Sequence, residues 1–141
     1  MEISELKAFS AQDVQDLDIL MQELSSRLGM TEERLQCVVS APDSHLFIAR
    51  EEDGHIIGCA TLVLYEAPSA RKGFIEDVVV SSKHRRKHIA KDILMAILEY
   101  AADYKPIELQ LTSKPERIAA NLLYQTLWFE RVNTNCYRIK L

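Results

Sequence analysis

The sequence has 141 residues, of which 48% are hydrophobic and 27% are charged. This length and composition suit one packed core, so we expect a single domain over residues 1–141 and exclude disordered and low-complexity classes. No apolar run approaches the roughly 18 residues of a membrane span, and the first residues lack a signal-peptide pattern. The three cysteines are odd in number and widely spaced. We therefore expect a cytoplasmic protein without disulfides or a metal site.

The charge is distributed unevenly along the chain. The formal net charge is −4, from 17 basic and 21 acidic side chains. Residues 83–91, KHRRKHIAK, carry five of the basic side chains, two of the four histidines and no acid. The rest of the chain sets 12 basic against 21 acidic side chains, or −9. A nucleic-acid binder usually spreads positive charge over a whole face, so this pattern favours one local anion site.

The N-terminal part of the chain predicts a strand and two helices. Residues 3–9 indicate a short edge strand. Ser10 and Asp13 then form a capping-box pattern, and apolar residues follow at helical spacing over positions 14–28. A second helix over residues 31–40 begins with a threonine cap.

The middle of the chain is rich in β-forming residues. The first two runs cover residues 46–50 and 55–65 and are joined by a Glu-Asp-Gly hairpin signal. A third run covers residues 74–80. After the basic segment, an amphipathic helix begins near His88 and ends before Pro106.

The last part of the chain predicts a strand, a helix and two more strands. The strand covers residues 107–111, and a second capping-box pattern, Ser113 with Glu116, opens the helix. Residues 129–141 indicate two strands around an Asn-Thr-Asn turn. The predicted order is βααββαβαββ, an α/β fold (α+β by some schemes) with a mixed sheet.

Two carboxylates interrupt the apolar strand 74–80. Simple alternation places Glu76 on one face with Val78 and Val80, and Asp77 on the other. One acid then points towards a covered region, where desolvation raises its pKa towards that of a useful base. The alternative is that one acid is solvated and the other pairs with an arginine, and the strand alone favours this alternative.

The basic segment lies between this strand and the following helix. The first turn of a helix offers free N–H groups and the positive end of the helix dipole. The added cations Lys83, Arg85, Arg86, Lys87 and Lys91 make a phosphate or pyrophosphate a natural ligand. The alternatives are a solvated basic turn and an RNA-contacting loop, and the scarcity of flanking aromatic residues disfavours RNA.

Two segments resemble the GNAT superfamily of N-acetyltransferases. VVVSSKHRRKHIAKDIL resembles motif A, in which a hydrophobic strand leads through Arg/Gln-x-x-Gly-x-Gly/Ala into a helix; Arg85 opens the pattern and Ala90 closes it. ERIAANLLYQTLWF resembles motif B, Asn-x-x-Ala-x-x-Leu-Tyr followed by Gly-Phe. The residues in register with motif B are Ala120, Leu123, Tyr124 and Phe129. The element order fits this family over essentially the whole chain.

The resemblance implies a mixed, mostly antiparallel sheet flanked by helices on both faces, and a use for acetyl-CoA. In that family acetyl-CoA binds where two adjacent parallel strands splay apart. Backbone groups of the strand would hold the acetyl and pantetheine parts, and the turn amides would hold the pyrophosphate. The implied cofactor-binding residues are Val78, Val79, Val80, Arg85, Arg86, Lys87, His88, Ile89, Ala90 and Tyr124.

The same resemblance suggests catalytic roles. Tyr124 would protonate the departing thiolate, a task suited to a phenol within hydrogen-bond reach. Without motif B, Tyr124 would be read as a core aromatic of an amphipathic helix. The acid that some members carry after the second parallel strand falls at Thr112. This leaves Glu76 as the candidate general base, with Asp77 second.

The sequence departs from the family pattern at three further positions. His88 replaces the glycine within the turn, Arg117 replaces the motif B asparagine, and Trp128 replaces the glycine before Phe129. Glycine permits a close approach of the backbone to pyrophosphate. An imidazole there would either crowd the cofactor or, when protonated, contact it.

Three functions remain open at this stage. The first is transfer of an acetyl group from acetyl-CoA to a primary amine of a small molecule or protein, by direct attack. The second is a non-catalytic GNAT-like binding module, and the third is an RNA-contacting domain that uses residues 83–91. We expect no membrane partner, and a homodimer stays open.

Overall fold

A computed structural model describes all residues, 1–141. The chain divides into two compact units, residues 1–111 and residues 112–141, which are described separately. None of the four α-helices has the length and apolar character that crossing a bilayer requires.

The first unit contains five strands, three α-helices and one short 3₁₀ turn. In chain order they are β1 (Glu2–Glu5), α1 (Ala11–Leu24), α2 (Glu32–Ser40), β2 (Ser44–Arg50), β3 (Ile56–Glu66), β4 (Arg71–Val80), η1 (Ser82–His84), α3 (Ile89–Ala102) and β5 (Glu108–Gln110). The strands form one sheet in the order β1-β2-β3-β4-β5. Only the β4–β5 pair is parallel, which confirms the mixed, mostly antiparallel sheet.

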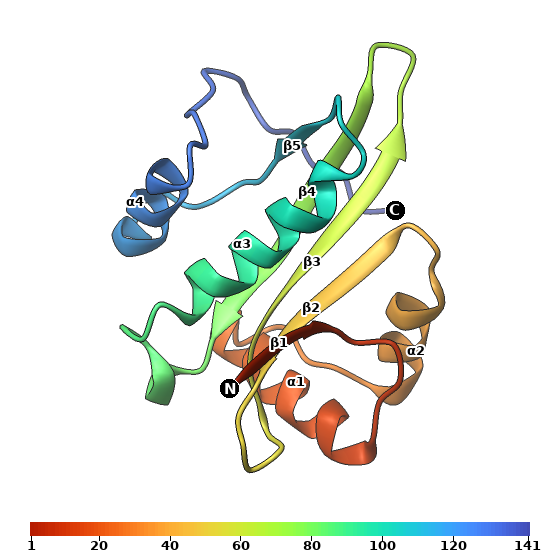
Figure 1. Ribbon diagram of the computed structural model, residues 1–141, viewed down its shortest axis with the longest axis vertical. Helices are drawn as coiled ribbons and strands as arrows, with labels where there is room; N and C mark the ends of the chain where they lie inside the picture. The colour runs from red at the N-terminus through yellow and green to blue at the C-terminus, as the bar shows by residue number, and fades with distance from the viewer. The chain divides into compact units, whose positions relative to one another are not determined.

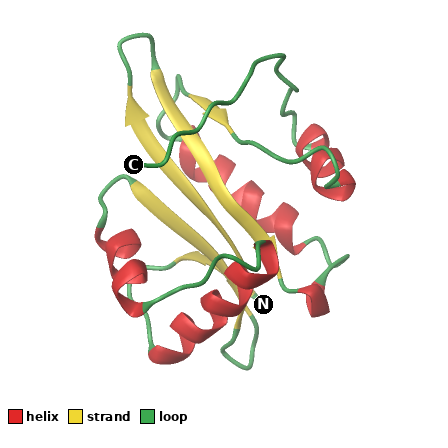
Figure 2. Ribbon diagram, turned by 180° about the vertical axis from the view of Figure 1, so that it is seen from behind, coloured by secondary structure: helices red, strands yellow, loops and turns green.

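Helices cover both faces of this sheet, as expected. Figures 1 and 2 show α3 over one face and α1 and α2 over the other. On the α1/α2 face, Leu17, Leu20 and Leu35 pack against Ile48 and Cys59 in a dry core. Burial of such side chains contributes about 1.5–3 kcal/mol each, so this core fixes where β3 and β4 run.

The helix starts follow the predicted caps. The Ser10 hydroxyl accepts from the Asp13 amide and the Asp13 carboxylate accepts from the Ser10 amide, which completes the capping box. The Thr31 hydroxyl accepts from the Arg34 amide at the start of α2. At the β2–β3 turn, Gly54 has a φ of 94°, the conformation that glycine supplies at little cost.

The observed element order, βααβββαβα, corrects the predicted order at two places. The predicted order has two strands between the second and third helices, whereas the three predicted runs 46–50, 55–65 and 74–80 each form a strand there, β2, β3 and β4. The two predicted strands in residues 129–141 do not form. Between them, the Thr134 amide donates to the carbonyl of Val132, which closes a tight turn. An unsupported two-stranded hairpin is also only marginally stable.

The second unit contains one helix, α4 (Ile118–Thr126). The predicted capping box of Ser113 and Glu116 is wrong, because α4 begins after Arg117, which makes no side-chain cap. Residues 114–117 instead close a turn in which the Arg117 amide donates to the Lys114 carbonyl. The side chain of Asn121 donates to both the Lys114 and Arg117 carbonyls. This bond fixes the turn to the helix.

Candidate functional site

A bulge interrupts β4 at Asp77. Cys59 pairs with Val79 and Thr61 with Glu76, so two residues of β4, Asp77 and Val78, face the single residue between them on β3. Asp77 has a φ of 54°, which is uncommon for a residue with a side chain. Such bulges bend a strand and re-aim its side chains.

The bulge reverses the predicted alternation. Cys59 and Val79 both belong to the core under α1, and Thr61 lies two residues from Cys59 on the same face. Glu76, the partner of Thr61, therefore shares the α1/α2 face with Val79. Val80 lies opposite Gly58, beside Ile93 of α3, on the other face. The expectation that Glu76 and Val80 share a face is wrong, because it assumed an unbroken strand.

The two acids of β4 have no ionic partner. Glu76 and Asp77 are both exposed, and neither carboxylate accepts a hydrogen bond or forms a salt bridge. Partial desolvation, together with the charge of Asp77, raises the pKa of Glu76. Desolvation also raises the pKa of Asp77, against the opposing charge of Arg34. The alternative in which one acid pairs with an arginine is therefore not what the structure contains.

The parallel strands β4 and β5 separate after three residues. Their pairs are Lys72 with Glu108, Gly73 with Leu109 and Phe74 with Gln110. Beyond Phe74, β4 continues to Val80 without a partner on that side. The backbone of Val78, Val79 and Val80 thus runs along an unpaired edge, where N–H and C=O groups are free for an extended ligand.

The turn after β4 presents a series of free backbone N–H groups. The amides of residues 85–91 donate no hydrogen bond within the chain, and the first helical bond of α3 is from Asp92 to the His88 carbonyl. This set includes Arg85, Arg86, Lys87, His88, Ile89 and Ala90. Seven successive free donors thus lie at the N-terminus of a 14-residue helix, where free N–H groups and the helix dipole favour an anion.

The side chains of this turn add positive charge. Lys83, Arg85, Arg86, Lys87 and Lys91 are all exposed, and none of them forms a salt bridge. The one contact between a side chain of the segment and a carboxylate is that of His84 Nε2 with Glu51 Oε1, at 3.7 Å. Five cations without carboxylate partners beside seven free amides favour a ligand with more than one negative charge.

The backbone keeps the glycine-type conformation at two positions that lack glycine. His88 has a φ of 61° and Trp128 a φ of 73°. A residue with a side chain pays roughly 1–2 kcal/mol in this region, which glycine does not. The His88 side chain is exposed. The turn therefore has the backbone shape that the motif glycine allows, at a cost in strain.

In the second unit, Tyr124 is a buried residue of α4. It is 6% exposed, and its ring packs edge-on against Phe129 with centroids 6.2 Å apart. Burial raises the pKa of the Tyr124 hydroxyl, against the opposing charge of Arg117. The phenol is therefore protonated at neutral pH and able to donate a proton.

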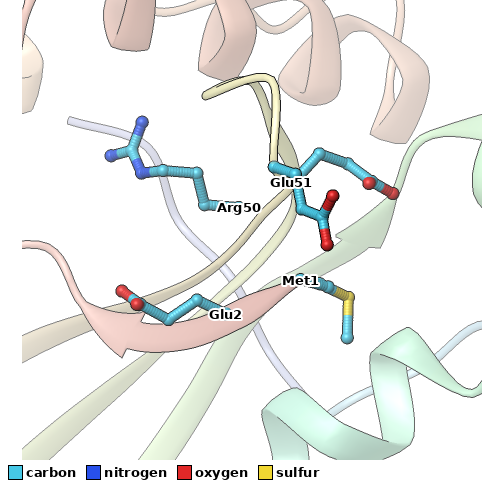
Figure 3. Close-up of a pocket in the computed structure, with 5 residues that line it drawn as sticks. Met1, Glu2, Arg50 and Glu51 are labelled. Carbon is cyan, nitrogen blue, oxygen red and sulfur yellow. The ribbon is translucent and has the colours of Figure 1, made fainter.

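One cavity of about 330 Å³ lies at another part of the first unit. Met1, Glu2, Arg50, Glu51 and Glu52 line it, as Figure 3 shows with the first four labelled. None of the residues predicted for catalysis or cofactor binding lines this cavity. No three His, Cys, Asp or Glu side chains gather in a way that could hold a metal ion.

Comparison with known proteins identifies the class of protein to which this fold and turn belong, the acetyltransferases. Residues 11–128 match the acetyltransferase (GNAT) family. The chain belongs to this family.

Individual relatives agree with this assignment. N-acetyltransferase family 8 member 2 from Rattus norvegicus is 32% identical over 87 residues, which cover 60% of this chain. They cover 38% of that protein, so the chain spans less than half of its curated relative.

Solved structures share the fold. A putative acetyltransferase from Agrobacterium tumefaciens is similar with a TM-score of 0.81 at 19% identity, over all of both chains. The enzyme AAC(6')-Iy, solved with the bisubstrate analogue CoA-S-monomethyl-acetylneamine, gives a TM-score of 0.77 at 20% identity over 99% of this chain and 97% of that one.

Sequence reasoning missed two polar residues next to the turn. The carboxylate of Glu23, at the end of α1, accepts hydrogen bonds from the amide and the hydroxyl of Ser82. These residues are 59 positions apart, and Glu23 lies on the exposed side of an amphipathic helix. No pattern in the sequence joins them, because only the folded sheet brings the end of α1 to the end of β4.

Proposed function

We propose that this protein transfers the acetyl group of acetyl-CoA to a primary amine of a small molecule or protein by direct attack. The observation that carries the proposal is the run of seven free amides after a strand whose edge is unpaired. Because the family match runs from residue 11 to 128, it crosses the boundary at residue 111, which supports one acetyltransferase domain over residues 1–141.

The residues present fit acetyl-CoA. The amides of residues 85–90, with the side chains of Arg85, Arg86 and Lys87, would bind the pyrophosphate. The unpaired backbone of residues 78–80 would bind the pantetheine and acetyl parts. When bound, acetyl-CoA supplies a thioester whose carbonyl is open to a nucleophile. Backbone N–H groups beside the β4 bulge would polarise that carbonyl.

Glu76 would act as general base on the acceptor amine, directly or through a water. Its support is a carboxylate that is exposed, lacks a partner and has a raised pKa, because such a group is a stronger base than an ordinary carboxylate. Asp77, the second candidate, has the same features. Tyr124 would donate a proton to the departing thiolate, and its support is a phenol kept protonated by burial.

An assay for released CoA thiol over a panel of amines tests the proposal. The panel contains polyamines, amino sugars, aminoglycosides and peptides with free amino termini or lysines. We expect thiol release that depends on at least one amine and falls by about 100-fold in Tyr124→Phe. The matched control Tyr65→Phe changes an exposed tyrosine of β3 and should leave the rate unchanged.

One result would contradict the proposed transfer, and another would contradict only the role of Tyr124. Thiol release at the hydrolysis rate with every amine, in a protein that binds acetyl-CoA, would indicate a non-catalytic module. A Tyr124→Phe rate equal to wild type would remove Tyr124 from the acid role while leaving transfer itself intact.

A further inference from the structure

The start of the basic turn is fixed by a carboxylate from a distant helix. Glu23 Oε2 accepts from the Ser82 amide at 3.0 Å, and Glu23 Oε1 accepts from the Ser82 hydroxyl at 3.1 Å. Both oxygens of the Glu23 carboxylate therefore accept hydrogen bonds from the same residue, Ser82. Hydrogen bonds to an ionised acceptor are stronger than neutral ones, and the two-point contact also sets the orientation of Ser82.

Ser82 is the last residue before the free amides that is hydrogen-bonded to a helix or strand outside the turn. Ser81 is held to β3 by a hydrogen bond from its amide to the Ile57 carbonyl, at 2.8 Å. After Ser82, the amide of His84 returns to Ser81, and His84 has one long contact to Glu51. From residue 85 to residue 91 no amide is bonded within the chain. The direction in which the turn leaves β4 is thus decided at residues 81 and 82.

We propose that Glu23 is a positioning residue for cofactor binding. By holding Ser82, it sets the free amides of residues 85–91 in register with the unpaired edge of β4, so that one extended ligand reaches both. This inference rests on the proposed use of acetyl-CoA. The role assigned to Glu23 is therefore to act through Ser82.

The test compares Glu23→Ala with Glu23→Gln, which keeps one acceptor oxygen, and with the control Glu99→Ala. Glu99 is an exposed acid of α3 with no hydrogen bond, so its removal changes the net charge equally. We expect Glu23→Ala to weaken acetyl-CoA binding by about tenfold and Glu23→Gln by less, with Glu99→Ala at the wild-type value. The turnover rate at saturation should stay near wild type.

A truncated substrate separates positioning from general damage. The thioester S-acetyl-N-acetylcysteamine lacks the pyrophosphate, so its transfer should be the same in Glu23→Ala and wild type. Trypsin supplies a readout without cofactor, because Lys83, Arg85, Arg86 and Lys87 are exposed cleavage sites. Cleavage there should be several-fold faster in Glu23→Ala at unchanged global stability.

Each outcome decides the matter. Wild-type cleavage in Glu23→Ala overturns the positioning role, whether or not acetyl-CoA binds. An equal loss with acetyl-CoA and with the truncated thioester also overturns it, since the damage is then general. Faster cleavage in a protein whose wild type shows no heat with acetyl-CoA overturns both the proposed function and the link of Glu23 to a cofactor.

Discussion

Two acidic regions of the first unit use the same residue types in opposite ways. On α1, Asp13 and Asp16 are buried and fully bonded. Arg50 donates to Asp13 at 2.8 Å, and Asp16 accepts from the Ile56 amide at 2.9 Å and contacts His55 Nδ1 at 3.1 Å. On β4, Glu76 and Asp77 are exposed and bonded to nothing. The acids of α1 hydrogen-bond this helix to the β2–β3 hairpin, whereas the side chains of the β4 acids make no such contact.

The backbone shows the same contrast. Around α1 and the β2–β3 turn, the only positive φ belongs to Gly54. From the bulge in β4 to the start of α3, three residues with side chains have positive φ: Asp77 at 54°, Arg86 at 65° and His88 at 61°. Unpaired carboxylates, free amides and strained residues thus gather in one segment. Proteins retain such costs mainly where function needs them, so the contrast separates the structural acids from the candidate catalytic ones.

The largest expected effect is on the candidate base. Glu76→Gln should lower kcat by about 100-fold or more, because the amide cannot take a proton from the amine. Asp77→Asn, the matched change one residue away, should lower it by less than about tenfold. Initial rates with a saturating amine measure both. Equal losses in the two variants would contradict the preference for Glu76 over Asp77 as the base. An unchanged kcat in Glu76→Gln would show that Glu76 is not the base.

The next effect is on stability, at the structural acids. Asp16→Ala leaves the buried amide of Ile56 without its acceptor and should lower the free energy of unfolding by about 2 kcal/mol. Urea denaturation measures this loss. Glu52→Ala, an exposed acid without a bond, should change it by less than about 0.5 kcal/mol. A loss of stability in Asp16→Ala as small as that in Glu52→Ala would mean that the hydrogen bonds of the α1 acids do not stabilise the fold, so they would not distinguish the α1 acids from the β4 acids.

The third effect concerns the strained turn. His88→Gly should relieve the cost of a φ of 61° and raise the free energy of unfolding by up to about 1 kcal/mol. Acetyl-CoA binding should become a few-fold tighter, because glycine allows closer approach to the pyrophosphate. His88→Ala keeps a Cβ and should give neither gain. If alanine equals glycine in both measurements, the strain at His88 is not what limits binding.

The smallest effect is on how the free energy of unfolding depends on pH. The β4 acids and Asp13 should change it in opposite directions as the pH rises. The pKa values of Glu76 and Asp77 are raised by folding, so their ionisation costs stability. Relative to Glu76→Gln/Asp77→Asn, the wild type should lose stability as the pH rises through the raised pKa values, by less than about 1 kcal/mol because both groups are exposed.

Asp13 should behave in the opposite way. Burial alone would raise its pKa, but bonds from Arg50 and Ser10 together lower it below 3.8. Its contribution is therefore complete above that value and is lost as the pH falls through the lowered pKa. Urea midpoints of wild type and Asp13→Asn between about pH 3 and pH 7 measure this. If the pH dependence of stability had the same sign for Asp13 as for Glu76 and Asp77, the distinction between the two acidic regions would be wrong.

Much of the fold followed from local patterns in the sequence. The caps at Ser10 and Thr31, the turn at Gly54 and the start of α3 after His88 each depend on residues within four positions of one another. Such short-range features are visible in a single sequence. The failures were at Ser113, where a turn displaced the helix start, and in residues 129–141, whose alternation lacks a partner strand.

For the candidate site, the sequence indicated the segment but not its three-dimensional geometry. The basic segment stands out in the sequence because its charge coincides with the boundary between a strand and a helix, and the structure has that boundary between β4 and α3. The bulge at Asp77 could not be found, since it depends on how β4 pairs with β3, and it moved Glu76 to the α1/α2 face. The Glu23–Ser82 contact spans 59 positions and leaves no local trace.

Calorimetric titration of the wild-type protein with acetyl-CoA tests most directly whether residues 85–91 and the edge of β4 form one cofactor site. We predict saturable binding of one acetyl-CoA per chain, with a dissociation constant below about 100 μM, that weakens at least tenfold in Arg86→Glu/Lys87→Glu. Absence of heat and of a thermal shift at about 1 mM acetyl-CoA, in folded protein, would contradict it.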